Sequence, residues 1–311
     1  MRGAEKDAAW FSVGQRETTR GMSTATNSAG WPEVAQGRRW LTWLAVAAAL
    51  LGLALLALNL YGLTQPLRGP LVASEVPGRM YGPAIPENVA LARLRALDAS
   101  DRRGFALEAA EIIGEAMSHI DWRTPTSAEI GDYRMTVPVW ENYLLYAARY
   151  LKPDTYRIYE FCSWRRALGR GIGQCGQQSS TVMGFLAENG FNTAIVYLEG
   201  HVVATAEVAP GEWYVLDPDY RAYMAHDLDT LRQRPELLRA AYAHNKKGHD
   251  GVGWMYVQHE PRLVYGGPEA RHPKGCVIEE VAYVLKWAIP AVLLVGAAGL
   301  FGFGRRRTKA A

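Results

Sequence analysis

Cysteine is scarce in this chain: only three of the 311 residues are cysteines. A free cysteine is often no more than a small buried hydrophobe, so the position of each one needs an explanation. The net charge is also small, at +3, which excludes the large basic surface that binding to nucleic acid requires. Internal repeats and low-complexity tracts are absent from the sequence as well. The chain is nevertheless long enough for one or two domains with proper cores.

Charged residues are missing altogether from two apolar runs near the ends of the chain. The runs are LTWLAVAAALLGLALLALNLYGL at residues 41–63 and WAIPAVLLVGAAGLFGFG at residues 287–304. A helix of about 20 apolar residues crosses a bilayer, and the snorkelling side chain of Lys286 extends the shorter second run. We therefore predict membrane-spanning helices at residues 40–63 and 281–304. The alternatives are a cleaved signal peptide for the first run and a buried core helix for the second.

Basic residues flank both runs on the same side of the expected membrane. Arg38 and Arg39 precede the first run, and Arg305–Arg307 follow the second. The positive-inside rule then places both ends of the chain in the cytoplasm and exports everything between the two spans. Residues 1–39 and 305–311 become cytoplasmic tails, and the first is expected to be disordered because it lacks apolar periodicity.

Between the two spans, the sequence predicts a linker followed by one domain. Residues 64–86 are rich in proline and glycine, which is typical of a linker, and residues 87–275 form the domain. Helical periodicity comes first and β-branched, aromatic strands follow, which predicts an α+β domain. The expected helices cover residues 89–97, 105–119, 140–151, 156–168, 175–189 and 228–244, and the expected strands cover residues 191–200, 201–209 and 212–220. Translation starts at Met1 or at Met22, and the sequence does not decide between them.

One cysteine lies where chemistry is expected. The segment GIGQCGQQSS, residues 171–180, places Cys175 at the start of a predicted helix, after a glycine-rich approach. Unpaired N–H groups and the helix dipole at such a position stabilise a thiolate, and they also donate to an oxyanion. A cysteine nucleophile needs a base and a group that orients the base. His201 begins the second expected strand and Asp217 ends the third, so both are candidates.

The contact between these two residues depends on strand register. If the strands pair as a hairpin around Pro210 and Gly211, His201 lies nine residues before Pro210 and Asp217 lies six residues after Gly211. The two side chains are then not directly opposed unless a bulge or a longer loop absorbs the offset.

Three short motifs together resemble the transglutaminase-like superfamily. They are GQC at residues 173–175, GH at residues 200–201 and EWYVLDP at residues 212–218. The resemblance covers about residues 171–220, with weaker agreement in the helices before them. It implies a papain-like α+β core that carries a Cys–His–Asp triad in this chain order.

The resemblance also implies roles for individual residues. Cys175 would be the nucleophile, His201 its general base and later acid, and Asp217 the group that fixes the imidazole tautomer. The backbone N–H of Cys175 would donate to the oxyanion, with Gln174 or Trp140 as the candidate second donor.

The sequence departs from the family pattern on both sides of the substrate site. Gly176-Gln177-Gln178 replaces the aromatic and aliphatic run that follows GQC in animal transglutaminases, and Val202-Val203 replaces the aromatic pair that follows the histidine in many members. These differences affect the expected substrate pockets more than the triad.

The remaining cysteines and histidines suggest structural roles. Cys162 and Cys276 are able to form a disulfide in an oxidising exterior, which would leave Cys175 unpaired. His244, His249 and His259 lie around a segment rich in glycine and lysine and are expected to be surface loop residues, because a metal site needs tighter ligand spacing. No metal and no cofactor is expected.

Two functions follow from these patterns. The first is a membrane-anchored, exported cysteine enzyme that attacks an amide, passes through a thioester and favours hydrolysis over crosslinking. Its expected substrate is a peptide or protein of the cell envelope. The second is a non-catalytic scaffold or peptide-binding module that uses the same fold in envelope or polysaccharide assembly.

Overall fold

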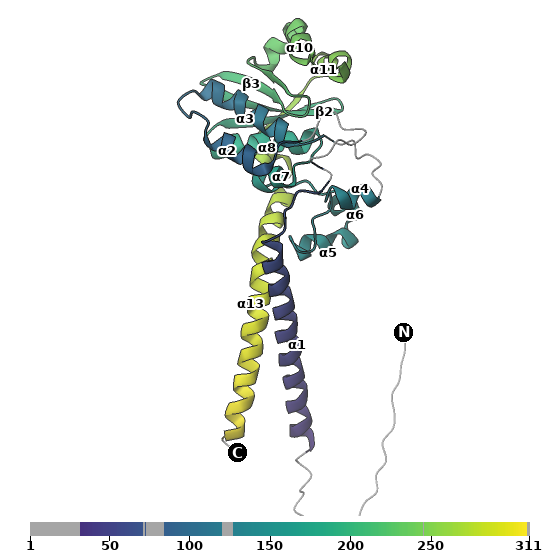
Figure 1. Cartoon of the computed structure of the whole chain (residues 1–311), viewed down its shortest axis with the longest axis vertical. Coiled ribbons are helices and arrows are strands. Elements are labelled where there is room, and N and C mark those ends of the chain that lie inside the picture. The colour runs from purple at the N-terminus through teal and green to yellow at the C-terminus, as the bar shows by residue number, and fades with distance from the viewer. Residues whose placement is uncertain (1–31, 71, 73–83, 120–126, 245, 310–311) are drawn as a thin grey trace, which may run out of the picture.

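The computed structural model describes residues 32–70, 72, 84–119, 127–244 and 246–309 of the chain. Residues 1–31 of the disordered tail expected over residues 1–39, and residues 71 and 73–83 of the linker expected over residues 64–86, lie outside this part. Two long helices, α1 (Pro32–Gly62) and α13 (Pro273–Lys309), run side by side below an α+β domain (Figure 1). Both helices are longer than the sequence predicts. Residues 32–39 and 305–309, which we expected in the tails, are helical because the apolar runs propagate into their flanks.

Both long helices are apolar enough to cross a membrane, over Arg39–Gly62 and Pro273–Gly302. Large apolar side chains on their outer faces are not covered by protein: Trp43 is 71% exposed and Val295 is 73% exposed. This exposure is the opposite of what a buried core helix shows. Where the helices meet they pack closely, and a Cβ added at Gly52 would lie 3.0 Å from the side chain of Leu294.

The domain begins with a layer of helices, and the last of them starts at Cys175. Phe105 stacks on Phe185 and Phe191, with ring centroids 5.7 and 5.5 Å apart, and the edge of Trp164 meets Phe185. These aromatic contacts join the helices into one core. The layer consists of α2 (Glu87–Arg95), α3 (Arg102–Ala116), α7 (Trp164–Arg170) and α8 (Cys175–Glu188). Three further helices, α4 (Ser127–Asp132), α5 (Tyr143–Leu151) and α6 (Pro153–Tyr156), lie beside the top of the two long helices (Figure 1).

A five-stranded antiparallel sheet follows, in the order β4-β3-β2-β1-β5. Its strands are β1 (Asn192–Leu198), β2 (His201–Ala209), β3 (Glu212–Asp217), β4 (Ala222–Met224) and β5 (Arg262–Tyr265). The three strands that the sequence predicts are β1, β2 and β3, and the α+β class is confirmed. The short edge strands β4 and β5 were not predicted.

Helices cover both faces of the sheet (Figure 1). Ile195, Ala204 and Leu216 face the core shared with α3 and α8. Val203 and Val215 face a second core, to which Leu238 and Tyr242 contribute. The second core is built with α9 (Leu228–Gln233), α10 (Pro235–Tyr242) and α11 (Lys246–Gln258), and α12 (Pro268–Arg271) then leads into α13.

Two helix predictions and one loop prediction are wrong in detail. The single helix expected over residues 156–168 is divided, because the backbone of Phe161 exchanges hydrogen bonds with the side chain of Gln177 and cannot be helical there. The helix expected over residues 228–244 is broken before Pro235. Proline has no backbone N–H to donate to the carbonyl four residues earlier, and its ring clashes with that carbonyl. The segment around His249, expected to be a loop, is part of α11.

The start of α13 is fastened to the domain. Cys162 and Cys276 form a disulfide, with Cα atoms 5.3 Å apart. The Glu279 carboxylate is 1% exposed and accepts hydrogen bonds from the backbone N–H of Cys162 and the hydroxyl of Tyr159, at 2.8 and 3.1 Å. It also pairs with Arg166 at 2.9 Å. The domain is therefore held to the apolar helix covalently and by a buried charge.

Replacing both Cys162 and Cys276 with alanine should lower the free energy of unfolding by about 2–5 kcal/mol. The cause is the entropy that the unfolded chain regains when residues 114 positions apart are no longer joined. Denaturant unfolding of the full chain in detergent, followed by tryptophan fluorescence, measures this change. The control is reductant, which should destabilise the parent but not the double variant. A double variant as stable as the parent would contradict the expectation.

Candidate active site

Cys175 is the first residue of α8 and is a free, half-buried thiol. The preceding residue, Gln174, has extended backbone angles and its carbonyl accepts the first helical hydrogen bond, from Gln178 at 3.0 Å. The first N–H groups of a helix have no partner within it. The thiol therefore sits at the positive end of α8, as the sequence predicts.

His201 lies at the end of the sheet, next to the start of α8. A two-residue turn, with Gly200 in the left-handed region at φ +78°, pairs Leu198 with His201 and starts β2 there. Ser179 of α8 donates a hydrogen bond to the carbonyl of Val202 at 3.0 Å. This bond ties the second turn of α8 to the start of β2.

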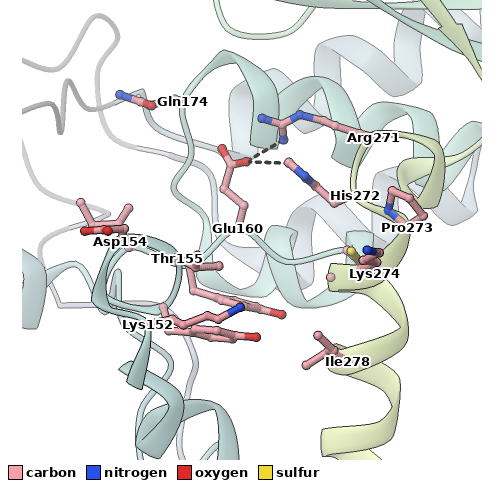
Figure 2. A pocket seen from close by; sticks show the side chains of 15 residues that line it. Lys152, Asp154, Thr155, Glu160, Gln174, Arg271, His272, Pro273, Lys274 and Ile278 are labelled. Carbon is pink, nitrogen blue, oxygen red and sulfur yellow. Dashed lines mark ion pairs between the residues drawn. The ribbon is translucent and has the colours of Figure 1, made fainter. Parts of the chain in front are cut away.

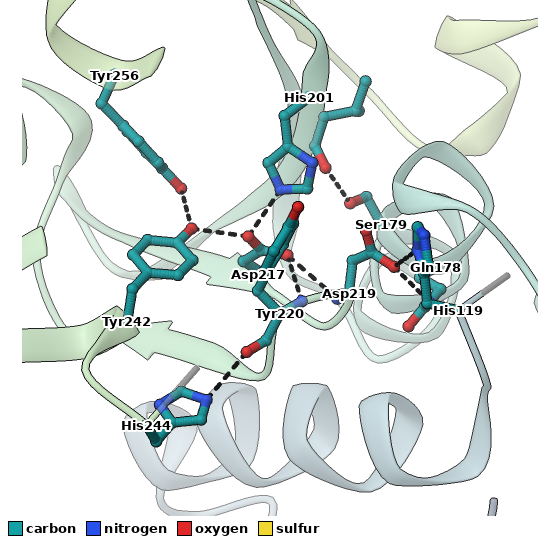
Figure 3. Close-up of polar contacts among 11 residues, drawn as sticks. His119, Gln178, Ser179, His201, Asp217, Asp219, Tyr220, Tyr242, His244 and Tyr256 are labelled. Carbon is teal, nitrogen blue, oxygen red and sulfur yellow. Dashed lines mark hydrogen bonds and ion pairs between the residues drawn. The ribbon is translucent and has the colours of Figure 1, made fainter. Parts of the chain in front are cut away.

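His201 and Asp217 are joined by a hydrogen bond of 2.7 Å between Nε2 and Oδ2, inside the protein (Figure 3). The bulge that this contact requires is present: the register of β2 and β3 shifts between Glu207 and Ala209. Beyond it, Ala204 pairs with Leu216, so continuing by one residue places Asp217 opposite Val203. His201 is two residues from Val203 and shares its face of the strand. The bulge thus puts the imidazole and the carboxylate on the same face.

The Asp217 carboxylate accepts four hydrogen bonds. Oδ1 accepts from the backbone N–H groups of Asp219 and Tyr220, both at 3.1 Å. Oδ2 accepts from His201 and from the hydroxyl of Tyr242 at 2.7 Å. Tyr242 in turn contacts the hydroxyl of Tyr256 at 2.9 Å. Asp217 is therefore both a turn residue before Pro218 and the partner of the histidine, and its lone pairs are satisfied.

This carboxylate changes the charge state of the imidazole. Burial disfavours the charged form of His201, but the charge and hydrogen bond of Asp217, together with Cys175, outweigh it and hold the pKa of His201 well above its usual range. Nε2 is engaged by Asp217, which leaves Nδ1 for Cys175. The ligating atoms of Cys175 and His201 lie within 4.8 Å of each other.

The site contains a second carboxylate, that of Asp219, which the sequence analysis did not identify. Asp219 is 1% exposed, and one of its oxygens lies within 4.8 Å of both the Cys175 sulfur and His201. Its Oδ1 contacts His119 Nδ1 at 2.7 Å and accepts from Gln178 Nε2 at 2.7 Å (Figure 3). The tripeptide Asp217-Pro218-Asp219 at the end of β3 was the available signal. It places two carboxylates on either side of one proline, so both could lie at the same turn.

Tyr220 covers the imidazole. Its ring meets that of His201 edge to face, with centroids 5.0 Å apart. Burial, together with the negative charges of Asp219 and Asp217, raises the pKa of Tyr220 to about 12. The phenol therefore stays neutral at neutral pH where it packs on the imidazole.

The residues that depart from the family pattern after GQC are buried in structural roles. The Gln177 amide exchanges hydrogen bonds with the backbone of Phe161 and accepts from the buried Arg170 at 3.1 Å. Gln178 holds Asp219. Gly176 leaves room for Arg271, since a Cβ there would lie 2.2 Å from its guanidinium.

A cavity of about 750 Å³ lies next to the start of α8 (Figure 2). Across it, Glu160 pairs with Arg271 at 2.6 Å and contacts His272 at 3.7 Å. Burial opposes the charge of Glu160, but His272 and Arg271 outweigh it and lower the pKa of this carboxyl. The other lining residues are Lys152, Asp154, Thr155, Tyr156, Ile158, Tyr159, Cys162, Gln174, Pro273, Lys274, Gly275 and Ile278.

The two candidate oxyanion donors lie in different places. Gln174 lines the cavity and precedes Cys175 directly. Trp140 contacts Gly62 at the end of α1, and the Arg134 guanidinium lies 5.3 Å from its ring. Trp140 therefore lies on the side of the domain that meets α1. Gln174 is the candidate that the chain keeps beside the thiol, and its role as a donor stays a prediction.

No family model, curated protein or solved structure matches this chain. The similarity to the transglutaminase-like superfamily consequently rests on the quoted motifs and on the Cys–His–Asp group, whose geometry is compatible with a catalytic triad.

Proposed function

We propose that this chain is a membrane-anchored cysteine enzyme with a transglutaminase-like, papain-like core that opens amide bonds through a thioester. The observation that carries the proposal is the grouping of three side chains at the positive end of α8: the Cys175 sulfur lies within 4.8 Å of a ring nitrogen of His201, and His201 is hydrogen-bonded to Asp217. Such an arrangement supplies nucleophile, base and orienting group in one place.

The steps follow from these positions. With the pKa of His201 held high, the ring carries the proton taken from Cys175 before the attack, and the Cys175 thiolate adds to the carbonyl carbon of the amide. The oxyanion that forms accepts hydrogen bonds from the N–H groups at the start of α8, with Gln174 as a candidate second donor. Collapse breaks the C–N bond, and the leaving amine takes the proton from His201. Asp217 holds the imidazole tautomer and stabilises its charged form in both directions.

The thioester is then resolved by an acceptor whose proton goes to His201. Water yields a carboxylic acid and restores the thiol, whereas an amine yields a new amide. Water needs no binding region of its own, but an amine acceptor needs a second one beside the acyl group. We therefore favour hydrolysis, that is, a protease or amidase.

The cavity beside Gln174 is the proposed binding region for the substrate chain. Tyr156, Ile158 and Ile278 offer apolar contacts there, and Lys152 and Lys274 offer positive charge. A peptide, with its mixed apolar and carbonyl surface, suits such a lining. Because α13 forms one wall, the substrate would be a polypeptide or peptide crosslink of the cell envelope near the membrane surface.

The proposed location is outside the cytoplasm, with both termini inside and α1 and α13 as the two spans. The disulfide between Cys162 and Cys276 supports an oxidising compartment for the domain. The basic residues that flank the outer ends of both apolar segments support the orientation.

Alkylation of the full chain in detergent by iodoacetamide at neutral pH tests the nucleophile. One adduct is expected, on Cys175, because the other two cysteines are joined. His201→Ala should slow the alkylation by about 100-fold or more, because the base is lost. His259→Ala is the matched control, since this exposed histidine contacts only Glu199 among the described ion pairs. Equal rates in the His201→Ala variant and the parent would leave the non-catalytic scaffold as the better account.

A thiol probe that cannot cross the inner membrane tests the topology. It should label Cys175 in intact cells whose outer layers are permeabilised. A second variant, Arg103→Cys in a Cys175→Ser chain, reports the location independently of the nucleophile, because Arg103 is 58% exposed. Labelling of this variant only after lysis of the inner membrane would place the domain in the cytoplasm.

A further inference from the structure

The candidate active site also holds three donors that suit a transition metal. A sulfur of Cys175, a ring nitrogen of His201 and a carboxylate oxygen of Asp219 all lie within 4.8 Å of one another. Tetrahedral zinc with thiolate, imidazole and carboxylate ligands requires donor separations of about 3.4–3.6 Å at its usual bond lengths. Side-chain rotations that close about 1 Å would bring the three donors to that spacing.

Each nitrogen and oxygen donor is already oriented by a second residue. Asp217 accepts from Nε2 of His201, which is the outer contact that metal-bound histidines normally make. Gln178 and His119 hold Oδ1 of Asp219, which leaves Oδ2 for a ligand.

Two carboxylates are buried at one site, which favours a cation there. Asp217 and Asp219 are 0% and 1% exposed, and the basic side chains that contact them are His201 and His119. Buried charges need partners, and the thiolate together with the imidazole prefers Zn²⁺ over Mg²⁺ or Ca²⁺.

We propose that Cys175, His201 and Asp219 bind one Zn²⁺ ion, with water as the fourth ligand. Binding displaces to the solvent any proton held on the sulfur and on the ring nitrogen that faces it, and it involves no change of oxidation state. The bound ion occupies the nucleophile. Zinc would therefore act as a reversible inhibitor, a consequence that rests on the proposed function, whereas the binding itself does not.

The test is a zinc titration of the full chain in detergent against a chromophoric chelator. One ion per chain is expected. Cys175→Ser, His201→Ala and Asp219→Asn should each weaken binding by about 10-fold or more, while His259→Ala should bind as the parent does. Circular dichroism and thermal melting of each variant exclude loss of the fold as the cause.

Asp219→Asn decides between a three-ligand site and an ordinary thiol–imidazole adduct. If this variant binds zinc as tightly as the parent, the proposed site is wrong. Binding that is equal in the parent and in the Cys175→Ser variant would overturn it too. Zn²⁺ should slow the alkylation of Cys175 by iodoacetamide, and a chelator should reverse this. The protection should be weaker in His201→Ala and Asp219→Asn than in the parent and in His259→Ala. A chain that binds zinc in this way but whose thiol alkylates independently of His201 would lose the proposed enzyme function and keep the metal site.

Discussion

The geometry of the site depends on the Asp217 carboxylate, which is buried completely and accepts four hydrogen bonds. Two of them close the turn after β3, one orients His201 and one comes from Tyr242. A buried carboxylate is tolerated only where its lone pairs are satisfied. The turn, the strand end and α10 are therefore fixed together. The Asp217 carboxylate thereby fixes the position of the His201 imidazole at the end of the hairpin.

The site forms where two separate cores meet at one end of the sheet. The nucleophile comes from α8, which packs on the face that carries Ala204 and Leu216. Asp217 is held from the opposite face, where Tyr242 and Tyr256 belong to the core of α10 and α11. His201 is the first residue of β2, at the end of the sheet, and its imidazole lies between Cys175 of α8 and Asp217. Cys162 of the disulfide and Gln174, the residue before Cys175, line the same cavity, and the start of α13 forms one of its walls.

Local patterns in the sequence predict part of this arrangement. The start of α8, the three central strands and the two apolar helices follow from periodicity and turn residues, which act within a few positions. Counting residues left a bulge or a longer loop as the ways to bring His201 opposite Asp217, and the structure has a bulge that puts them on one face although not directly opposed. Asp219 and His119 were missed because they meet across 100 positions, and Tyr242 because its helix was predicted without its packing. The division of the helix expected at residues 156–168 depends on Gln177, which no local pattern reveals.

The central claim is that Asp217 acts on Cys175 through His201, and a double-mutant cycle measures this coupling directly. The rate of Cys175 alkylation would be compared in the parent, Asp217→Asn, His201→Ala and the double variant, with thermal melting of each as the check on folding. If the three residues form one relay, removing Asp217 should slow the parent but should change nothing further once His201 is absent. Effects that multiply in the double variant would contradict the account, because they would mean that the carboxylate and the imidazole act on the thiol independently.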